Sequence, residues 1–144
     1  MKKTLVRSIL FAAMLLVPAV CFAQTQEAGP IRSSPAYSEV LLRKTELQAD
    51  LEALLADYTD ANPKIIDLRF EIASIDKSLE KIFGVKPSET GKLTLALGKL
   101  IVKRASIDTE RSRLLRTYNA DHPEVKRAKR RVEIFDAAIN EVLK

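Results

Sequence analysis

The residues that come nearest to a phosphate-binding loop are Gly91 and Lys92. Such a loop needs two glycines separated by four residues, followed by a lysine and by a serine or threonine that binds magnesium. Here six residues separate Gly84 from Gly91, and Leu93 stands at the hydroxyl position. The sequence therefore does not predict a nucleotide site, and no cofactor is expected.

Acidic pairs at helical spacing are the second candidate for chemistry, because paired carboxylates can act as general acid and base. The pairs are Glu46 with Asp50 and Asp57 with Asp60. They belong to faces expected to be solvated, and no apolar pocket is predicted around them. His122 is the only histidine, whereas a metal site needs three or four ligands. We expect no catalytic residue, no metal site and no enzymatic activity, and we assign His122 to helix capping.

The elements that would position any site come from an internal repeat with a period of sixty residues. Residues 54–65 read Leu-Leu-Ala-Asp-Tyr-Thr-Asp-Ala-Asn-Pro-Lys-Ile, and residues 114–125 read Leu-Leu-Arg-Thr-Tyr-Asn-Ala-Asp-His-Pro-Glu-Val. After each proline, apolar residues recur at steps of three and four, as they do in helices that pack along a seam. These seam positions are Ile65, Leu68, Ile72, Ile75, Leu79 and Ile82 in the first copy, and Val125, Ala128, Val132, Phe135, Ile139 and Val142 in the second.

Each copy is interpreted as an antiparallel helical hairpin, so the predicted fold is all-α with two coiled-coil hairpins. Proline is disfavoured inside a helix but suits its first position, so the chain should reverse at Asn62-Pro63 and at His122-Pro123. Tyr58 and Tyr118 lie one turn before these reversals, where each ring can pack across the hairpin tip. The alternative for the two tyrosines is a platform that stacks a carbohydrate or a peptide.

A signal peptide is predicted at residues 1–23, which places the protein in the periplasm. A basic start is followed by an apolar stretch and by small residues at Cys21 and Ala23. The apolar stretch is shorter than the roughly 20 residues of a membrane span, which disfavours an uncleaved anchor. Lipid attachment at Cys21, the only cysteine, is disfavoured by Val20 before it. Cleavage after Ala23 would leave no cysteine for a disulfide.

The remaining boundaries follow from proline, glycine and capping residues. Ser34 before Pro35 predicts the first helix start, and Ser88 or Thr90 is expected to cap the third helix. The predicted segments are a flexible tether at 24–33, the first hairpin at 34–83, a connector at 84–90 and the second hairpin at 91–144.

Charge is divided unequally between the two copies. Three of the 24 basic residues lie in the signal peptide, which leaves 21 against 19 acidic residues, so nucleic acid is not an expected partner. Residues 24–83 contain 7 basic and 11 acidic residues, whereas residues 84–144 contain 14 and 8. This asymmetry favours contact between the copies, within one chain or between subunits. Arg104 and Arg111 stand at seam positions, where they either reach solvent or meet carboxylates of the acidic copy.

Two sets of outward residues are candidates for partner binding. A lone hairpin would be marginal in stability, so the hairpins are expected to pack together, to dimerise, or both. Ile66 and Phe70 form a second apolar stripe, and their counterparts sixty residues on are cations. The basic strip, as we call the second set, consists of Lys126, Arg127, Lys129, Arg130 and Arg131. It is either a solvated face or a docking site for an anionic partner such as acidic polysaccharide, lipid head groups or an acidic protein.

The tyrosine-to-proline segments at 58–65 and 118–125 resemble the Tyr-Thr-x-x-His-Pro-x-Val motif of the chain-length-determinant (Wzz-like) polysaccharide copolymerases. In that family the motif marks the passage between long periplasmic helices, and no catalysis is attributed to it. The resemblance covers about a dozen residues in each copy and the heptads after them. Those copolymerases carry two membrane spans, which this sequence does not predict after residue 23, so chain-length control itself is not carried over.

The expected function is that of a non-enzymatic periplasmic scaffold or adaptor. It would act through helical faces on a protein partner or on further copies of the chain, and the resemblance implies an accessory role in envelope polysaccharide assembly or export. The alternative is a small periplasmic holdase chaperone, because an exported, basic chain rich in coiled coil is also similar to the Skp type.

Overall fold

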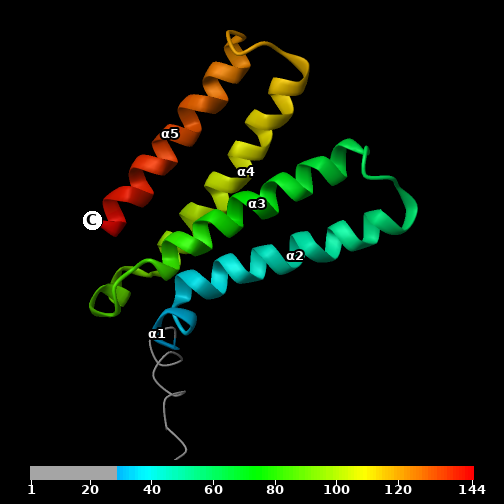
Figure 1. Ribbon diagram of the computed structural model, residues 1–144. Coiled ribbons are helices and arrows are strands. Elements are labelled where there is room, and N and C mark those ends of the chain that lie inside the picture. Colours follow the sequence, from blue (N-terminus) through cyan, green and yellow to red (C-terminus); the bar gives the residue numbers. More distant parts are fainter. Residues whose placement is uncertain (1–28) are drawn as a thin grey trace, which may run out of the picture.

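The computed structural model describes residues 29–144, and within them every regular element is a helix (Figure 1). In chain order these are α1 (Gly29–Arg32), α2 (Pro35–Asp57), α3 (Pro63–Phe83), the 3₁₀ helix η1 (Pro87–Lys92), α4 (Leu95–Thr117) and α5 (Pro123–Leu143). α2 and α3 form one antiparallel hairpin, and α4 and α5 form the other. The predicted all-α fold is thus confirmed. The predicted signal peptide lies outside the described residues.

Side-chain caps explain why the chain reverses where the repeat places its prolines. The Oδ1 atom of Asn62 accepts a hydrogen bond from the backbone N–H of Lys64 at 2.9 Å. Sixty residues on, Nδ1 of His122 accepts from the N–H of Glu124 at 3.3 Å. In both cases the proline that follows the cap is the first helical residue, so no donor is lost. The predicted reversals at Asn62-Pro63 and His122-Pro123 are therefore observed.

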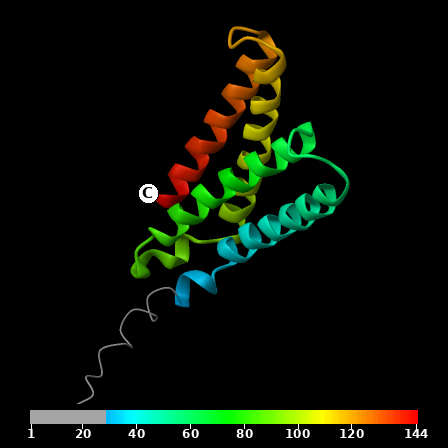
Figure 2. The same cartoon turned by 45° about the vertical axis from the view of Figure 1, so that its right-hand side comes forward.

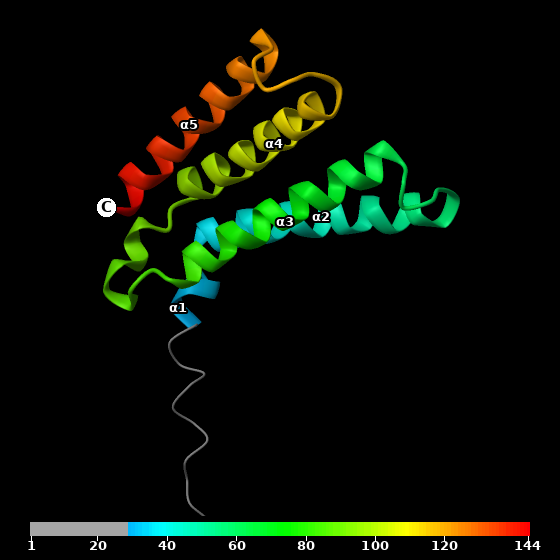
Figure 3. The same cartoon turned by 45° about the horizontal axis from the view of Figure 1, so that its top comes forward.

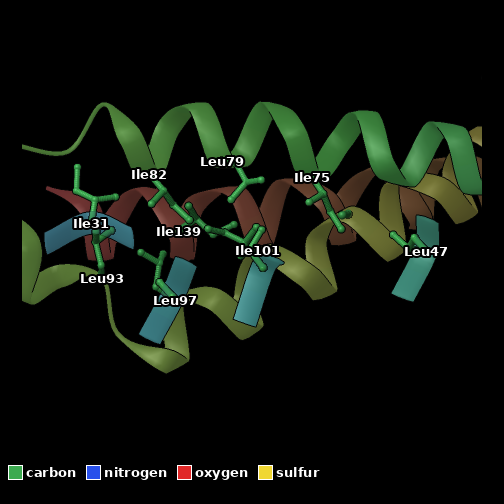
Figure 4. Packing of buried hydrophobic residues seen from close by; sticks show 12 residues of the cluster. Ile31, Leu47, Ile75, Leu79, Ile82, Leu93, Leu97, Ile101 and Ile139 are labelled. Carbon is green, nitrogen blue, oxygen red and sulfur yellow. The ribbon is translucent and has the colours of Figure 1, made fainter. Parts of the chain in front are cut away.

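α4 is the central helix, because it packs against α2, α3 and α5. α2 and α5 are the outer helices and lie on opposite sides of α4, and α3 packs against both α2 and α4 (Figures 1, 2 and 3). Figure 4 shows how the core joins the helices, with Ile82 of α3, Ile101 of α4 and Ile139 of α5 meeting in one cluster. The two hairpins therefore pack against each other within one chain.

The predicted seams are buried in the structure, although not evenly. The buried members are Ile65, Ile75, Leu79 and Ile82 on α3, and Val125, Ala128, Val132 and Ile139 on α5. The other seam residues are half-buried. α4 buries a wider face than a single seam, because three helices contact it.

Gly98 allows α2 and α4 to approach closely where they cross. A Cβ atom at this position would lie 2.8 Å from Cβ of Glu39 and 3.0 Å from the carbonyl oxygen of Ala36. Near the same crossing, the backbone N–H of Ala36 donates to the carbonyl of Leu93 at 3.1 Å. This bond satisfies an amide in the first turn of α2 that has no partner within its own helix.

Two predicted boundaries differ from the structure. Residues 29–33 were expected to belong to a tether, but Gly29–Arg32 forms the turn α1, whose Ile31 is buried in the core. The connector was expected to end at residue 90, whereas η1 runs to Lys92 and α4 begins at Leu95, capped by Thr94. In both cases an isolated apolar residue is the cause, since Ile31 and Leu93 pack into the core and hold their segments against it.

Candidate interaction surfaces

A polar cluster joins α3, α4 and α5 around Arg104. Its Nε donates to Oδ1 of Asp136 at 3.1 Å, and its Nη1 donates to Asp108 at 3.0 Å and to the hydroxyl of Ser74 at 2.9 Å. Arg111 lies 2.9 Å from the other carboxylate oxygen of Asp108. Both arginines therefore contact carboxylates, but these carboxylates belong to the second copy, as the arginines do. The acidic first copy contributes only the hydroxyl of Ser74.

The ion pair between Arg104 and Asp136 has an exact counterpart in the first hairpin. Lys44 on α2 lies 2.6 Å from Asp76 on α3, and both residues stand sixty positions before their equivalents. Each pair bridges the two helices of one hairpin with both side chains partly shielded from water. This pairing was not predicted, although the sequence contains the signal for it, because Asp76 and Asp136 recur at the same sixty-residue offset as the apolar seam.

Within residues 29–144, Asp67 makes the only ion pairs between the two copies, whose unequal charges predict such contact. Its carboxylate, only 18% exposed, binds Arg113 at 3.2 Å and also binds Arg116, so an acid of α3 holds two cations of α4. A second shielded pair, Arg43 with Glu71 at 2.9 Å, lies inside the first hairpin. Burial alone would lower the pKa of the Arg43 guanidinium. The hydrogen bond and the negative charge of Glu71 have the opposite and larger effect, so the pKa of Arg43 is raised.

The hairpin tips carry the two repeated tyrosines, both exposed. Tyr118 stacks on His122 with a centroid distance of 4.0 Å and an interplanar angle of 16°, which fixes the cap of α5 against the end of α4. The first tip has Asn62 in place of the imidazole, and Tyr58 is 54% exposed. The predicted packing across the tip is thus seen at Tyr118.

A shallow groove runs between α3 and α5, with α4 as its floor. Its lining is formed by Ser74, Lys77, Ser78, Lys81, Ile82, Ile101, Arg104, Asp136, Ile139 and Leu143. Within residues 29–144, no group of three or more histidines, cysteines or carboxylates is arranged to hold a metal ion. None of the helices in this range has the length and apolar character to cross a membrane.

The two predicted partner-binding sets lie on different helices. Ile66 is exposed and Phe70 is half-buried on α3. The basic strip lies on α5 and is exposed throughout. Four of its five cations contact carboxylates of the second hairpin, and the pairs are Lys126 with Asp121, Arg127 with Glu124, Arg130 with Glu133, and Arg131 with Glu110. Within residues 29–144 the strip makes no ion pair with the acidic first hairpin, so the attraction expected between the two copies does not involve it.

An acidic face lies on α2, and its residues were predicted only as carboxylate pairs exposed to solvent. Its members are Glu46, Asp50 and Asp57, which are all exposed and lie on one side of the helix, and no lysine or arginine occurs between residues 45 and 57. Leu42, one turn earlier on the same helix, is 58% exposed. On α5, Ile134 lies one turn after Arg130 and is 56% exposed. The two outer helices thus present opposite charges, each beside an exposed aliphatic side chain.

Comparisons of the chain with models of known protein families, with curated proteins and with solved structures gave no match.

Proposed function

We propose that the protein is a non-enzymatic scaffold of the periplasm that binds its partners through the outer faces of its helices. The observation that carries this proposal is the opposite charge of the acidic face on α2 and the basic strip on α5. Complementary charged faces speed encounter and fix the orientation of a partner. The exposed Leu42 and Ile134 beside them supply apolar area that a partner can bury.

The periplasmic location and the link to polysaccharide rest on the sequence. Residues 1–23 have the charge and hydropathy of a signal peptide. The likeness of the two tyrosine-to-proline segments to the chain-length determinants supports an accessory role in envelope polysaccharide assembly or export. The observed helix reversals at Pro63 and Pro123 agree with the place of that motif between long helices.

The proposal is tested by capturing partners from envelope extracts with the wild-type protein and with a variant of the strip. The variant Lys126→Gln, Arg127→Gln, Arg130→Gln removes three exposed cations, and a matched control replaces three exposed lysines elsewhere, Lys81, Lys86 and Lys99, by glutamine. We expect the wild type and the control to capture the same one or two native proteins, and the strip variant to lose them.

A parallel aggregation assay separates the scaffold from the holdase chaperone. A scaffold should leave the aggregation of several unrelated unfolded proteins unchanged. Suppression of their aggregation, equal for the wild type and the strip variant, would replace the scaffold by a holdase.

A further inference from the structure

We infer that the basic strip of one copy binds the acidic face of a second copy, so that the protein assembles head to tail. This inference rests on the proposed function, because it names the partner of one of the same faces.

Charge complementarity is the first observation. On α2, Asp50 and Asp57 make no ion pair within the described part of the chain. Glu46 pairs only with Arg43 of the same helix at 3.3 Å, and its own side chain is 53% exposed. On α5, Lys129 makes no ion pair within that part, and the pairs made by Arg127 and Arg130 join side chains that are about half exposed or more. Exposed pairs of this kind contribute little and exchange readily. Both faces therefore keep charge that an opposite surface can neutralise.

The placement of apolar residues is the second observation. Leu42 and Ile134 are the two most exposed of the large hydrophobic side chains in the described region. Leu42 lies one helical turn from Glu46. Ile134 lies one turn from Arg130, so each charged face has an aliphatic side chain beside it. Pairing of the two faces would remove both side chains from water while the charges set the register.

The arrangement of the helices decides the symmetry of the assembly. α2 and α5 lie on opposite sides of α4, so the faces cannot meet within one chain (Figures 1 and 3). A two-fold dimer would need both faces on the same side, whereas opposed faces give a head-to-tail contact that continues into a chain or closes into a ring.

The size of the contact predicts weak association. Residues 45–57 of α2 extend over about 20 Å at 1.5 Å per residue, and residues 126–137 of α5 over about 18 Å. One pair of helices buries less than a standard protein interface, so the assembly should depend on concentration and dissociate in salt.

Two charge-reversal variants test the inference. The first, Glu46→Lys, Asp50→Lys, Asp57→Lys, makes both outer faces basic. The second, Lys126→Glu, Arg127→Glu, Arg130→Glu, makes both acidic. Sedimentation of the purified wild type at low salt, between about 10 and 500 μM, should show a mass that increases with concentration, and each variant alone should associate at least about tenfold more weakly.

Mixing supplies the decisive result. An equimolar mixture of the two variants again contains opposite faces, so association should return to within about threefold of the wild type. A control with three reversed charges elsewhere, Lys81→Glu, Lys86→Glu, Lys99→Glu, should associate as the wild type does. Circular dichroism checks that each variant keeps its helix content and cooperative melting, so a variant that fails to fold is recognised and replaced by its single substitutions.

A wild type that remains monomeric throughout, or variants whose mixture does not recover, would overturn the inference. Binding of an acidic polysaccharide by the strip in a monomeric wild type would also overturn it and assign the strip to a polymer. The proposed function fails separately, because its capture experiment can succeed with a monomeric protein.

Discussion

The crossing of α2 and α4 at Gly98 should not tolerate a single methyl group. In Gly98→Ala the new Cβ would lie 2.8 Å from Cβ of Glu39, where ordinary contact begins at 3.4 Å, so the helices would have to separate by about 0.6 Å. Neither neighbour can rotate away, since the contacts are with a Cβ atom and with the backbone of Ala36. The clash is therefore met by a shift of whole helices.

The change in the free energy of unfolding of Gly98→Ala combines the cost of overpacking with the higher helix propensity of alanine. Overpacking of this kind costs about 1 to 3 kcal/mol, and rigid neighbours on both sides place Gly98→Ala at the upper end. Alanine in a helix interior regains about 1 kcal/mol over glycine. The free energy of unfolding should thus fall by about 2 kcal/mol, which corresponds to a decrease of about 6 to 10 °C in Tm for a domain of this size.

Urea denaturation followed by circular dichroism measures this change, with Gly91→Ala as the matched control. No heavy atom lies within 4 Å of a Cβ built on Gly91, so that variant should stay within about 0.5 kcal/mol of the wild type. A Gly98→Ala protein as stable as the control, or more stable than the wild type, would refute the close crossing of α2 and α4.

Three other substitutions probe the tip, the apolar stripe and the contact between hairpins. His122→Ala should lower the free energy of unfolding by about 1 kcal/mol in urea denaturation, and His122→Asn, which restores the cap of the first tip, should recover most of it. Phe70→Glu should lower the free energy of unfolding by about 1.5 kcal/mol, which is half the loss expected for a fully buried aromatic, or it should lower the oligomer mass. Asp67→Asn should lower the free energy of unfolding by about 1 kcal/mol at low salt, because Arg113 and Arg116 lose a shared carboxylate. The loss should be clearly smaller at about 0.5 M salt, where the charges are screened.

Each substitution has a result that would contradict its reasoning. Equal stability of the alanine and asparagine variants at position 122 would remove the capping role. An unchanged melting point and mass in Phe70→Glu would leave the stripe as ordinary exposed surface. A loss in Asp67→Asn that is independent of salt would point to packing rather than charge.

The hairpins could be predicted because each signal in the sequence is local. Asn62 and His122 cap the helices that their prolines begin, and the apolar seam fixes which side of α3 and α5 turns inward. Turn and cap geometry involve only a few neighbouring residues, so a pattern repeated twice is enough to locate them. The same reasoning misplaced the start of α4, since the position of Leu93 depends on the core formed by distant helices.

The docking of one hairpin on the other could not be read from periodicity. It depends on the close approach at Gly98 and on the contact of Asp67 with Arg113 and Arg116, both of which join residues far apart in the chain. The total charge of each copy indicated attraction between them. It did not indicate that the basic strip would face outward while arginines of α4 meet the acidic copy.

Comparison of the two hairpins separates what the fold needs from what a partner can use. The pairs Lys44 with Asp76 and Arg104 with Asp136 occupy equivalent positions and bridge the helices of each hairpin, so the repeat keeps them as part of its internal construction. The outer faces follow no such rule. Sixty positions after Glu46 and Asp57 of the acidic face stand Ser106 and Thr117. Sixty positions before Lys126 and Arg130 of the basic strip stand Ile66 and Phe70. Internal stability does not demand that difference, since exposed charge contributes little to folding. The proposed head-to-tail contact between copies would use both faces, which gives this difference a role outside the folding of a single chain.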